Sequence, residues 1–185
     1  MAGPAKPLNG IGDPAFASGG FKVTRKANAH DLTDNGSADL LARDASGTLW
    51  RDDTFDWPVG NQVLTARRTK VSTGWQAYDQ IEAAGNHAGG TAGDVVARDT
   101  TGVLWSFLGK GDGTFAPRTR IGGGWSAFSQ LVGAGDMNND GRGDLVAYGA
   151  GGTSVYLGTG VWSAPFTRTT TNLYAGEGTT FNSVA

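Results

Sequence analysis

Cysteine is absent from the 185 residues of this chain. Its absence excludes disulfide bonds, zinc sites built on thiolates and catalysis by a thiol. It leaves the compartment open, because proteins without cysteine occur inside and outside cells. The sequence also has no apolar run long enough to span a bilayer, and its start, MAGPAKPLNG, lacks the apolar core of a secretory signal. We therefore expect no membrane span and no signal peptide within these residues.

Proline is scarce as well, with 6 Pro against 31 Gly, and the formal net charge is only -2. No basic stripe of the kind that binds nucleic acid is present, so we expect no nucleic-acid partner. The glycines follow no collagen period and instead indicate many tight turns between short strands. No segment combines a sustained 3.6-residue period with helix caps, so the sequence predicts an all-β protein.

A unit of about 50 residues recurs three times along the chain. The segments ADLLARD, GDVVARD and GDLVAYG each follow a polar loop and precede a turn that contains glycine. The aspartates that anchor these segments are Asp39, Asp94 and Asp144. Arginines recur at a similar interval, at Arg68, Arg118 and Arg168. The chain therefore uses one structural unit three times.

Each unit contains four short runs rich in β-branched and aromatic residues, separated by turns of Gly, Asp and Asn. Four strands in about 50 residues is the size of a β-propeller blade. We predict a single repeat domain over 1–185 with about three full four-stranded antiparallel blades, at roughly 21–75, 76–125 and 126–175. Partial strands are expected at 12–20, where GDPAF resembles GDGTF of the second unit, and at 181–185, where FNSVA resembles FSQLV.

The segment Asp136–Asp144, DMNNDGRGD, is the densest cluster of oxygen ligands in the chain. Alternating carboxylates and amides around a glycine turn can present several oxygens to one hard cation, which is what calcium requires. An EF-hand would also need a glutamate at the position of Ala147 and a helix on either side. The segment therefore predicts a calcium loop within a β structure.

The units resemble the FG-GAP or VCBS repeats of integrin-like β-propellers, in the form common in secreted actinobacterial proteins. The resemblance rests on DMNNDGRGDLVA, DLTDNGSADLLARD, the paired LW residues and RTRIGGGW, and it extends over nearly the whole chain beyond residue 20. It implies a β-propeller, a secreted or cell-surface location, and Ca²⁺ as cofactor. It does not define one function, because these repeats occur in enzymes, lectins and adhesins.

The family pattern has acidic or amide ligands at loop positions one, three and five, a backbone carbonyl at seven and an aspartate at nine. In the third unit these are Asp136, Asn138, Asp140, the carbonyl of Arg142, and Asp144. In the first unit they are Asp31, Thr33, Asn35, the carbonyl of Ser37, and Asp39. The first loop has fewer carboxylates, so weaker binding is expected there. The alternative for both loops is a polar turn whose side chains bond backbone amides.

The second loop, NHAGGTAGD, departs from this pattern. Ala88 and Gly90 stand where side-chain ligands are needed, so we expect the loop to hold no metal. His87 within the loop, and His30 before the first loop, are interpreted as solvated side chains. The ion is then a local brace, and a blade can form without it.

Trp50 and Trp105 occupy matching strand positions, with Val155 or Tyr156 as their expected counterpart in the third unit. A residue that recurs at one strand position is expected to pack between neighbouring sheets. The regular spacing of the three arginines likewise indicates a structural task. We expect them to cover an aromatic ring or to pair with a carboxylate of the next unit.

Three further tryptophans are the candidate ligand-binding residues. Trp75 and Trp125 each follow a glycine turn, and at a rim their ring faces could stack against sugars. Core packing is the alternative for both. Trp57 lies in an insertion that lengthens the first unit, and it is the aromatic residue that we most expect to be exposed.

No catalytic constellation is visible in the sequence. The two histidines have no serine nucleophile signature to serve, and phosphate-loop and dinucleotide fingerprints are missing. We therefore predict that the chain is not an enzyme but a calcium-braced binding module for glycans or a protein partner. The alternatives are a structural, self-assembling propeller unit and an accessory domain of a secreted enzyme.

Three blades are fewer than the four to eight that usually close a propeller. An open arc would leave apolar sheet faces uncovered, which few proteins tolerate over large areas. The sequence therefore predicts closure by a second copy, by the remaining blades of a longer chain, or by exchange of the FNSVA strand. Two copies would give an even number of blades, six or eight. The ligand and the native blade number stay open.

Overall fold

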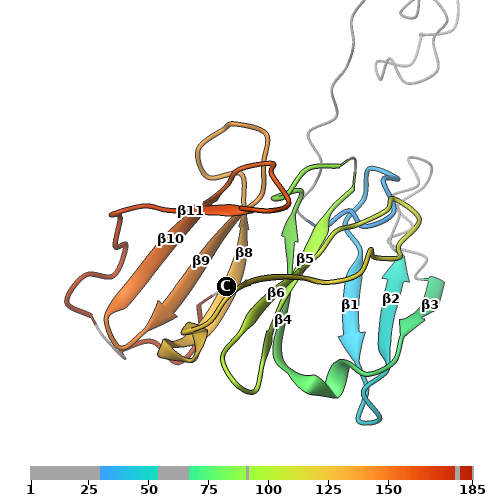
Figure 1. The fold of residues 1–185 in the computed structure, drawn as a ribbon, viewed down its shortest axis with the longest axis horizontal. Helices are drawn as coiled ribbons and strands as arrows, with labels where there is room; N and C mark the ends of the chain where they lie inside the picture. Colours follow the sequence, from blue (N-terminus) through green and yellow to red (C-terminus); the bar gives the residue numbers. More distant parts are fainter. Residues whose placement is uncertain (1–29, 54–66, 91, 178–179, 185) are drawn as a thin grey trace, which may run out of the picture.

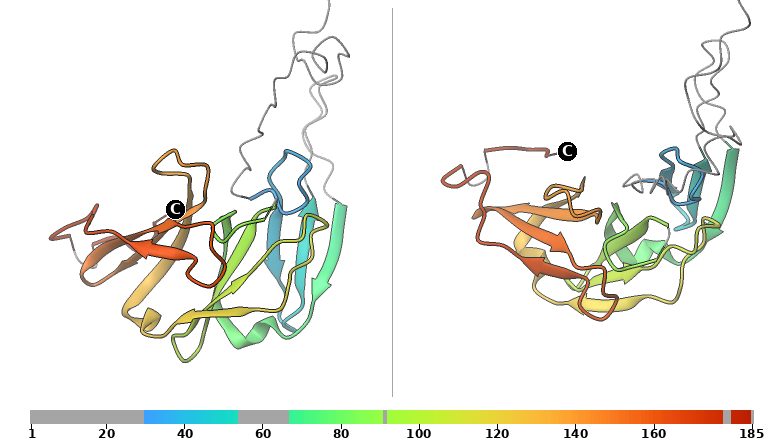
Figure 2. Two further views of the ribbon diagram at one scale, coloured as in Figure 1. Left: turned by 45° about the horizontal axis from the view of Figure 1, so that its top comes forward. Right: turned by 90° about the horizontal axis from the view of Figure 1, so that it is seen from above.

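The computed structural model describes residues 30–53, 67–90, 92–177 and 180–184. Within these ranges the chain folds into three antiparallel β-sheets that lie side by side along an arc (Figures 1 and 2). Strands that are consecutive in sequence are hydrogen-bonded neighbours in every sheet. The first and third sheets lie at the two ends of the arc, with the second sheet between them. The predicted all-β architecture of propeller blades is confirmed.

The described strands divide among the three units as three in the first and four in each of the other two. The first unit contains β1 (Leu40–Arg43), β2 (Leu49–Asp53) and β3 (Arg67–Ser72). The second unit contains the single 3-10 turn η1 (Trp75–Ala77) and strands β4 (Tyr78–Gly85), β5 (Asp94–Asp99), β6 (Leu104–Phe107) and β7 (Thr119–Gly122). The third unit contains η2 (Trp125–Ala127), β8 (Phe128–Gly135), β9 (Asp144–Gly149), β10 (Gly152–Gly158) and β11 (Phe166–Arg168).

An aspartate fixes the hairpin turn in each of the first two units. Asp99 Oδ1 accepts the amide N–H of Thr101 at 2.9 Å, and its Oδ2 accepts the indole N–H of Trp105 at 2.8 Å. Asp44 accepts the indole N–H of Trp50 at the same distance. Hydroxyl, indole and amide donors together lower the pKa of both carboxyls. The tryptophans of these hairpins are thus held by the turns that precede them.

The strand register corrects the expected counterpart of Trp50 and Trp105 in the third unit. Trp105 lies opposite Ala97 across the β5–β6 hairpin, and Ser154 lies opposite the equivalent Ala147 across the β9–β10 hairpin. Ser154, and neither Val155 nor Tyr156, is therefore the counterpart of Trp105. The reason is that the third hairpin is one residue shorter than the second, which shifts every position after its turn.

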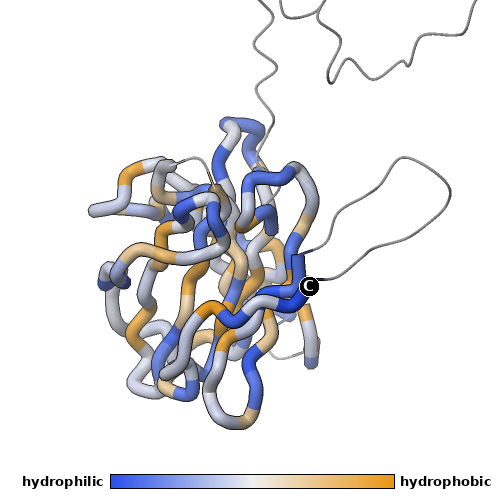
Figure 3. Tube along the Cα trace, turned by 90° about the vertical axis from the view of Figure 1, so that its right-hand side faces the viewer, coloured by the Kyte–Doolittle hydropathy of each residue, from blue (hydrophilic) through white to orange (hydrophobic). Residues whose placement is uncertain are grey.

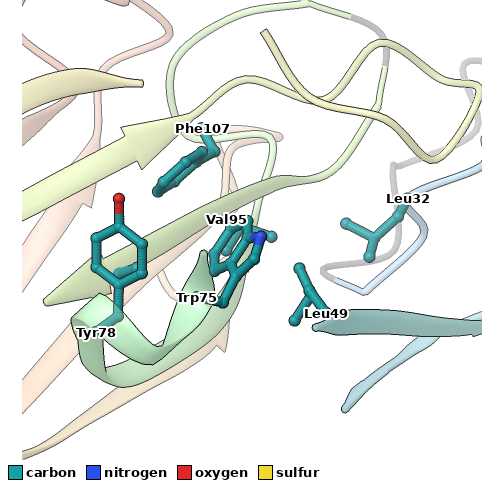
Figure 4. Close-up of a cluster of buried hydrophobic side chains, with 7 residues drawn as sticks. Leu32, Leu49, Trp75, Tyr78, Val95 and Phe107 are labelled. Atoms are coloured by element: carbon teal, nitrogen blue, oxygen red, sulfur yellow. The ribbon is translucent and has the colours of Figure 1, made fainter. Parts of the chain in front are cut away.

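A hydrophobic core lies between each pair of neighbouring sheets. At the first boundary, Leu32 and Leu49 of the first unit pack with Trp75, Val95 and Phe107 of the second (Figure 4). At the second boundary the buried cluster comprises Ala84, Val96, Leu104, Trp125, Leu131, Leu145 and Ala147. In Figure 3 hydrophobic and hydrophilic stretches alternate along the chain, with several hydrophilic loops at the outside. The units therefore stabilise one another across their boundaries.

Backbone hydrogen bonds repeat across the same boundaries. The first amide of each 3-10 turn donates to the hairpin glycine of the preceding unit, from Trp75 to Gly47 at 2.9 Å and from Trp125 to Gly102 at 3.0 Å. The guanidinium of Arg98 reaches the next unit as well and donates to the Trp125 carbonyl at 3.1 Å. Each unit thereby fixes the point at which the following unit begins.

The described C-terminal segment repeats a contact of the strands before it. Gln80 on β4 donates to the carbonyl of Ser129 on β8 at 2.6 Å, and Gln130 on β8 donates to the carbonyl of Asn182 at 2.7 Å. The segment is held beside β8 as β8 is held beside β4, but residues 181–184 form no strand, so the partial strand at 181–185 stays a prediction. The other partial strand, expected at 12–20, lies outside the described residues.

Candidate binding pocket and metal loops

The loops at 31–39 and 136–144 share one pattern of hydrogen bonds. In the third unit both oxygens of Asp136 accept backbone amides, from Asp140 and from Gly141, at 2.9 Å each. Asp31 accepts the equivalent amides of the first loop at 3.1 and 2.7 Å. The carboxylate at the first position therefore organises the loop backbone in both units.

The backbone turn is shared by the second loop too. The fourth loop residue has a left-handed conformation in every unit, at Asp34 (φ 55), Gly89 (φ 93) and Asn139 (φ 60). Asn and Asp tolerate this conformation better than other residues with a Cβ, and glycine adopts it freely. All three loops thus make the same turn, although only the first and third carry the predicted ligand residues.

The anchor aspartate at the ninth position is buried in all three units. In the third unit Asp144 accepts the amide of Met137 at 2.8 Å and the amide of Gly158 at 2.9 Å. Asp94 makes the corresponding bonds in the second unit, to Ala88 at 3.1 Å and Gly109 at 2.8 Å. Because the second loop lacks side-chain ligands, this carboxylate has a structural task that does not depend on metal. It ties the loop to the end of the third strand of the blade.

The other predicted ligands of the third loop contact one another. Asn138 donates to Asp140 at 3.1 Å, and the Arg142 guanidinium approaches the same carboxylate at 3.3 Å. In the first loop, Thr33 donates to Asp39 at 3.1 Å and Asn35 accepts the amide of Ser37 at 2.7 Å. Across the described residues, no three His, Asp or Glu side chains converge to hold a metal ion. The calcium site stays a prediction, and its oxygens here bond mainly to amides.

His87 is fully buried, which corrects its interpretation as a solvated side chain. Its Nε2 lies 2.9 Å from the Ser106 hydroxyl, and its ring stacks on Phe166 at 4.6 Å between centroids. The outer loop of the third unit covers the imidazole, a contact between units that the isolated sequence does not reveal. His30 is half-buried, and its carbonyl accepts the amide of Asp39 at 2.7 Å.

A pocket of about 1100 Å³, hereafter the larger pocket, opens between the second and third units. Trp125, Phe128 and Tyr156 supply its aromatic lining, with 4.7 Å between the Trp125 and Tyr156 ring centroids. Its polar lining comes from the third unit and comprises Thr153, Ser154, Arg168, Thr169, Thr170, Thr171 and Asn172. One apolar wall thus faces a set of hydroxyl, amide and guanidinium groups.

The polar side of the larger pocket is held in place by its own hydrogen bonds. Arg168 donates to the Ser154 hydroxyl at 2.9 Å. Asn172 accepts the Thr153 amide at 2.8 Å and donates to the Gly151 carbonyl at 2.9 Å. Strand β11 ends at Arg168, so the four residues that follow line the pocket instead of extending the sheet.

A smaller pocket of about 500 Å³ lies at the equivalent place between the first and second units. Its aromatic lining is Trp75, Tyr78, Phe107 and Phe115, and its arginine is Arg118. Phe107 and Tyr156 are equivalent because each lies opposite the residue that follows the anchor aspartate. The larger pocket therefore carries a phenol hydroxyl at this position, where the smaller pocket has a phenyl ring and carries its own hydroxyl on Tyr78. Burial raises the pKa of Tyr156.

The structure places the three candidate tryptophans differently from an exposed rim. Trp75 and Trp125 are buried in the two cores, and only a small part of each indole borders a pocket. Their contact with a ligand stays a prediction. Trp57 lies outside the described residues. Among the described residues, the tryptophan with an exposed indole is Trp162, in the loop between β10 and β11, which the repeat pattern did not single out.

Two of the three repeated arginines have structural contacts of the expected kinds, but within their own unit, whereas Arg168 donates to the Ser154 hydroxyl. The Arg118 guanidinium lies 4.0 Å from the Trp105 ring centroid and covers it. Arg68 pairs with Asp52 at 2.8 Å on the neighbouring strand of the same sheet. No carboxylate of a following unit is needed, because the strand register places these arginines beside partners on the neighbouring strand of their own blade.

Sequence reasoning missed Tyr156 and Asn172 as pocket residues. Tyr156 was hidden by the one-residue difference between hairpins, which only the strand register resolves. Asn172 stands where the segment TTTN replaces TRIG of the second unit after the repeated arginine. This departure from the repeat is the feature of the sequence that could have indicated a separate role for the segment.

Comparison with known proteins supports the fold assignment. The FG-GAP-like repeat family matches residues 91–147, from the second loop to β9. Among solved structures, an Agrocybe aegerita lectin that recognises non-reducing terminal N-acetylglucosamine is similar, with 22% identity and a TM-score of 0.51. The alignment covers 79% of this chain and 38% of the lectin chain, and the likeness concerns the fold alone. A search of curated proteins found no match.

None of the helices among the described residues is long and apolar enough to cross a membrane. The lining of the larger pocket contains no His, Asp, Glu, Cys or Lys. A general acid and base, or a nucleophile with its base, would have to come from elsewhere.

Proposed function

We propose that this chain is a non-catalytic binding module of the β-propeller type that takes a glycan in the larger pocket. The observation that carries the proposal is the pairing of aromatic rings with a polar wall in one cavity between blades. Sugars present an apolar face and a ring of hydroxyls, so they are recognised by an aromatic surface together with a few placed donors and acceptors. An accessory role beside a secreted enzyme, or a protein ligand, uses the same fold but does not account for this pocket.

Arg168 and Tyr156 are the residues expected to give the pocket its selectivity. Arg168 is exposed, lines the larger pocket and donates to the Ser154 hydroxyl, and a guanidinium carries five N–H donors in all. Tyr156 adds a hydroxyl at the position where the smaller pocket has Phe107. A neutral or weakly acidic sugar with an acetamido or carboxyl group suits this cation better than a basic ligand.

N-acetylglucosamine is the first probe, because a lectin of similar fold recognises it. Isothermal titration with this sugar, followed by a glycan array, should show saturable binding at one site per chain. Arg168→Ala and Tyr156→Phe should each weaken binding by about tenfold, which corresponds to about 1.4 kcal/mol for one lost hydrogen bond. Tyr156→Phe should also fold normally, since phenylalanine stands at the equivalent position, Phe107.

Arg68→Ala is the matched control, because it removes the repeated arginine of the first unit, away from the larger pocket. Its affinity should equal that of the unaltered chain. If no sugar on the array binds, or if all three variants bind alike, the assignment of the larger pocket is wrong.

Calcium bracing of the third loop is the second part of the proposal. Asp136, Asn138, Asp140, the Arg142 carbonyl and Asp144 provide the hard oxygen donors that calcium prefers. A bound ion would neutralise the carboxylates and hold the loop in one conformation. The first loop, with Thr33 at its third position, is expected to bind more weakly. An extracellular location, where calcium is plentiful, is proposed on the same basis.

Calcium titration followed by thermal unfolding tests this brace. At a hundredfold excess over the dissociation constant, calcium should stabilise the fold by about 2.7 kcal/mol. Asp140→Ala should abolish this gain, whereas Asn86→Ala, at the first position of the second loop, should leave it intact. Equal calcium responses in Asp140→Ala and the unaltered chain would show that the third loop is only a turn.

A further inference from the structure

The third unit lies at one end of the arc (Figure 2). Its outer face carries exposed apolar side chains. Met137 is 42% exposed, Leu173 48% and Phe181 37%. A hollow of about 320 Å³ lies among these elements and is lined by Val132, Gly133, Ala134, Met137, Val146, Leu173, Tyr174 and Val184. Polar side chains are absent from this lining apart from the tyrosine hydroxyl. The surface is here named the trailing face.

The residues equivalent to Met137 in the other two units are buried. Leu32 and His87 hold the second position of their loops, as Met137 does, and both are 0% exposed. Each lies under the outer loop of the following unit, whose glycine amide donates to its carbonyl, from Gly113 to Leu32 at 3.2 Å and from Gly160 to His87 at 2.9 Å. The surfaces of the first and second units that correspond to the trailing face are thus each covered by the unit that follows.

The first unit shows the complementary exposure, on what is here named the leading face. Leu40, which follows the anchor aspartate, is 63% exposed, whereas the equivalent Val95 and Leu145 are 0% exposed. Ala42 on the same strand is also exposed, and its equivalents Ala97 and Ala147 are buried. The preceding unit covers these positions in the second and third blades.

The two exposed positions correspond to side chains that pack together inside the chain. Leu32 and Val95, the equivalents of Met137 and Leu40, belong to the same buried cluster at the first boundary (Figure 4). The leading and trailing faces are therefore the two halves of an interface that this chain already forms between its own units. The surface that best fits the trailing face is therefore the leading face of another copy of this chain.

We propose that a second copy of this chain docks its leading face on the trailing face, and that two copies close into a ring of six blades. Leu40 of each copy then packs beside Met137 of the other, and the two interfaces are related by a twofold axis. Such a head-to-tail contact either closes into a ring or continues into a fibre. Closure is favoured over a fibre because the three blades already lie along a curve (Figure 2), and six blades fall within the range of four to eight that forms closed propellers. The proposal is independent of the glycan pocket.

The contact between copies is weaker than the contacts within the chain. Asp52 stands on the leading face where Phe107 stands at the first internal boundary, so a charged side chain takes the place of an aromatic ring. Less apolar area is therefore buried per interface. The ring is expected to dissociate on dilution, so the mass of the particle depends on protein concentration.

Sedimentation equilibrium of the whole chain over a range of concentrations tests the proposal. The expected mass at high concentration is twice the 19.1 kDa of one chain. Leu40→Asp and Met137→Lys each alter an exposed side chain, on opposite faces, and each should reduce the particle to a single chain. Val161→Asp, at an exposed apolar residue of the β10–β11 loop, is the matched control and should still pair.

Mixing the two charged variants gives a sharper readout. In a mixed pair, one interface is unaltered and the other places the introduced aspartate near the introduced lysine, so pairing should return. A single-chain mass at all concentrations would overturn the proposal and leave the trailing face to another partner. Pairing that survives both substitutions would place the contact elsewhere, and a ladder of masses above two chains would exclude the closed ring.

Discussion

His87 occupies in the second loop the place that Leu32 occupies in the first, and both side chains are fully buried. Burial lowers the pKa of His87 to about 4, so the imidazole is neutral in the folded protein at pH 7. Asp94, whose carboxylate lies 3.8 Å from the ring, has its pKa raised to about 6, mainly by burial. Two titrating groups thus lie under one loop, with opposite effects on stability.

The sign of each effect follows from proton binding in the two states. Unfolded His87 titrates near 6.5 and binds protons that the folded form excludes, so its share of stability is complete above pH 6.5 and is lost as the pH falls toward 4. Folded Asp94 binds a proton more readily than the unfolded carboxyl, whose pKa is 3.8, so its share is present at low pH and is lost as the pH rises through 6.

His87→Leu should make the protein less sensitive to mild acid. At pH 7 the variant should lose about 1 to 2 kcal/mol, because the Ser106 hydroxyl loses its partner. Between pH 7 and pH 5 the deficit should shrink by about 1 to 2 kcal/mol, since only the unaltered chain must exclude the imidazole proton. Urea unfolding at both pH values measures the difference.

Ser106→Ala serves as the control for His87→Leu. It removes the same hydrogen bond but keeps the imidazole, so it should retain the full pH dependence of the unaltered chain. Parallel pH profiles for His87→Leu and the unaltered protein would show that the buried ring does not titrate as assigned.

At the scale of the loop, the anchor aspartate is the constant part and the metal ligands are the variable part. Asp94 and Asp144 make the same two amide bonds although only the third loop carries the other acidic ligands. This explains how a blade forms around the second loop, in which Ala88 and Gly90 supply no ligand. The carboxylate joins the loop to the third strand whether or not an ion is near.

Asp144→Ala should therefore destabilise the fold even in the absence of calcium. The buried amide of Gly158 and the partly buried amide of Met137 would lose their acceptor, at a cost of about 2 to 4 kcal/mol. Asp140→Ala, at an exposed position, should change stability by less than about 0.5 kcal/mol in chelator. Denaturant unfolding in EDTA compares the two variants. Similar stabilities for both would mean that the anchor has no role beyond metal binding.

At the scale of the whole molecule, the cores lie at the boundaries between units, so each blade depends on a neighbour. The second unit is covered on both faces, whereas the leading and trailing faces each lack such a cover among the described residues. Pairing of two copies would bury both faces at once. Association and folding stability are then linked by mass action.

The melting temperature of the unaltered chain should consequently rise with its concentration. Each tenfold increase favours the paired state by up to about 1.4 kcal/mol, which corresponds to roughly 2 to 4 °C for a chain of this size. Leu40→Asp should melt at one temperature throughout. Differential scanning calorimetry at three concentrations makes the comparison, and a constant melting temperature for the unaltered chain would argue against pairing.

The blade architecture could be predicted from the sequence because the repeat supplies the same local signals three times. Anchor aspartates, glycine turns and β-branched runs recur together, and such agreement between levels leaves little choice of fold. The buried environment of His87 could not be predicted, because Phe166 and the outer loop that cover it lie in the next unit. A pattern within one repeat does not reveal contacts between repeats.

The larger pocket escaped prediction for a related reason. Its residues come from two units, and one of them, Tyr156, follows a hairpin whose length differs by one residue from its counterpart. Trp75 and Trp125 drew attention as repeated aromatics, yet repetition reflected their packing in the cores. The polar residues that distinguish the pocket stand where the repeat is lost, as at Asn172.

The arrangement of cores at unit boundaries also orders the local opening of the native state. Strand β5 is buried along nearly its whole length, whereas most residues of β1 are exposed. Opening free energies rise with the number of covered faces, and units stacked in a line lose structure from the ends inward. Amide protons of the middle blade therefore exchange last. Amide protons at the two ends of the arc exchange sooner, and a molecule that binds at an end will slow the exchange there first.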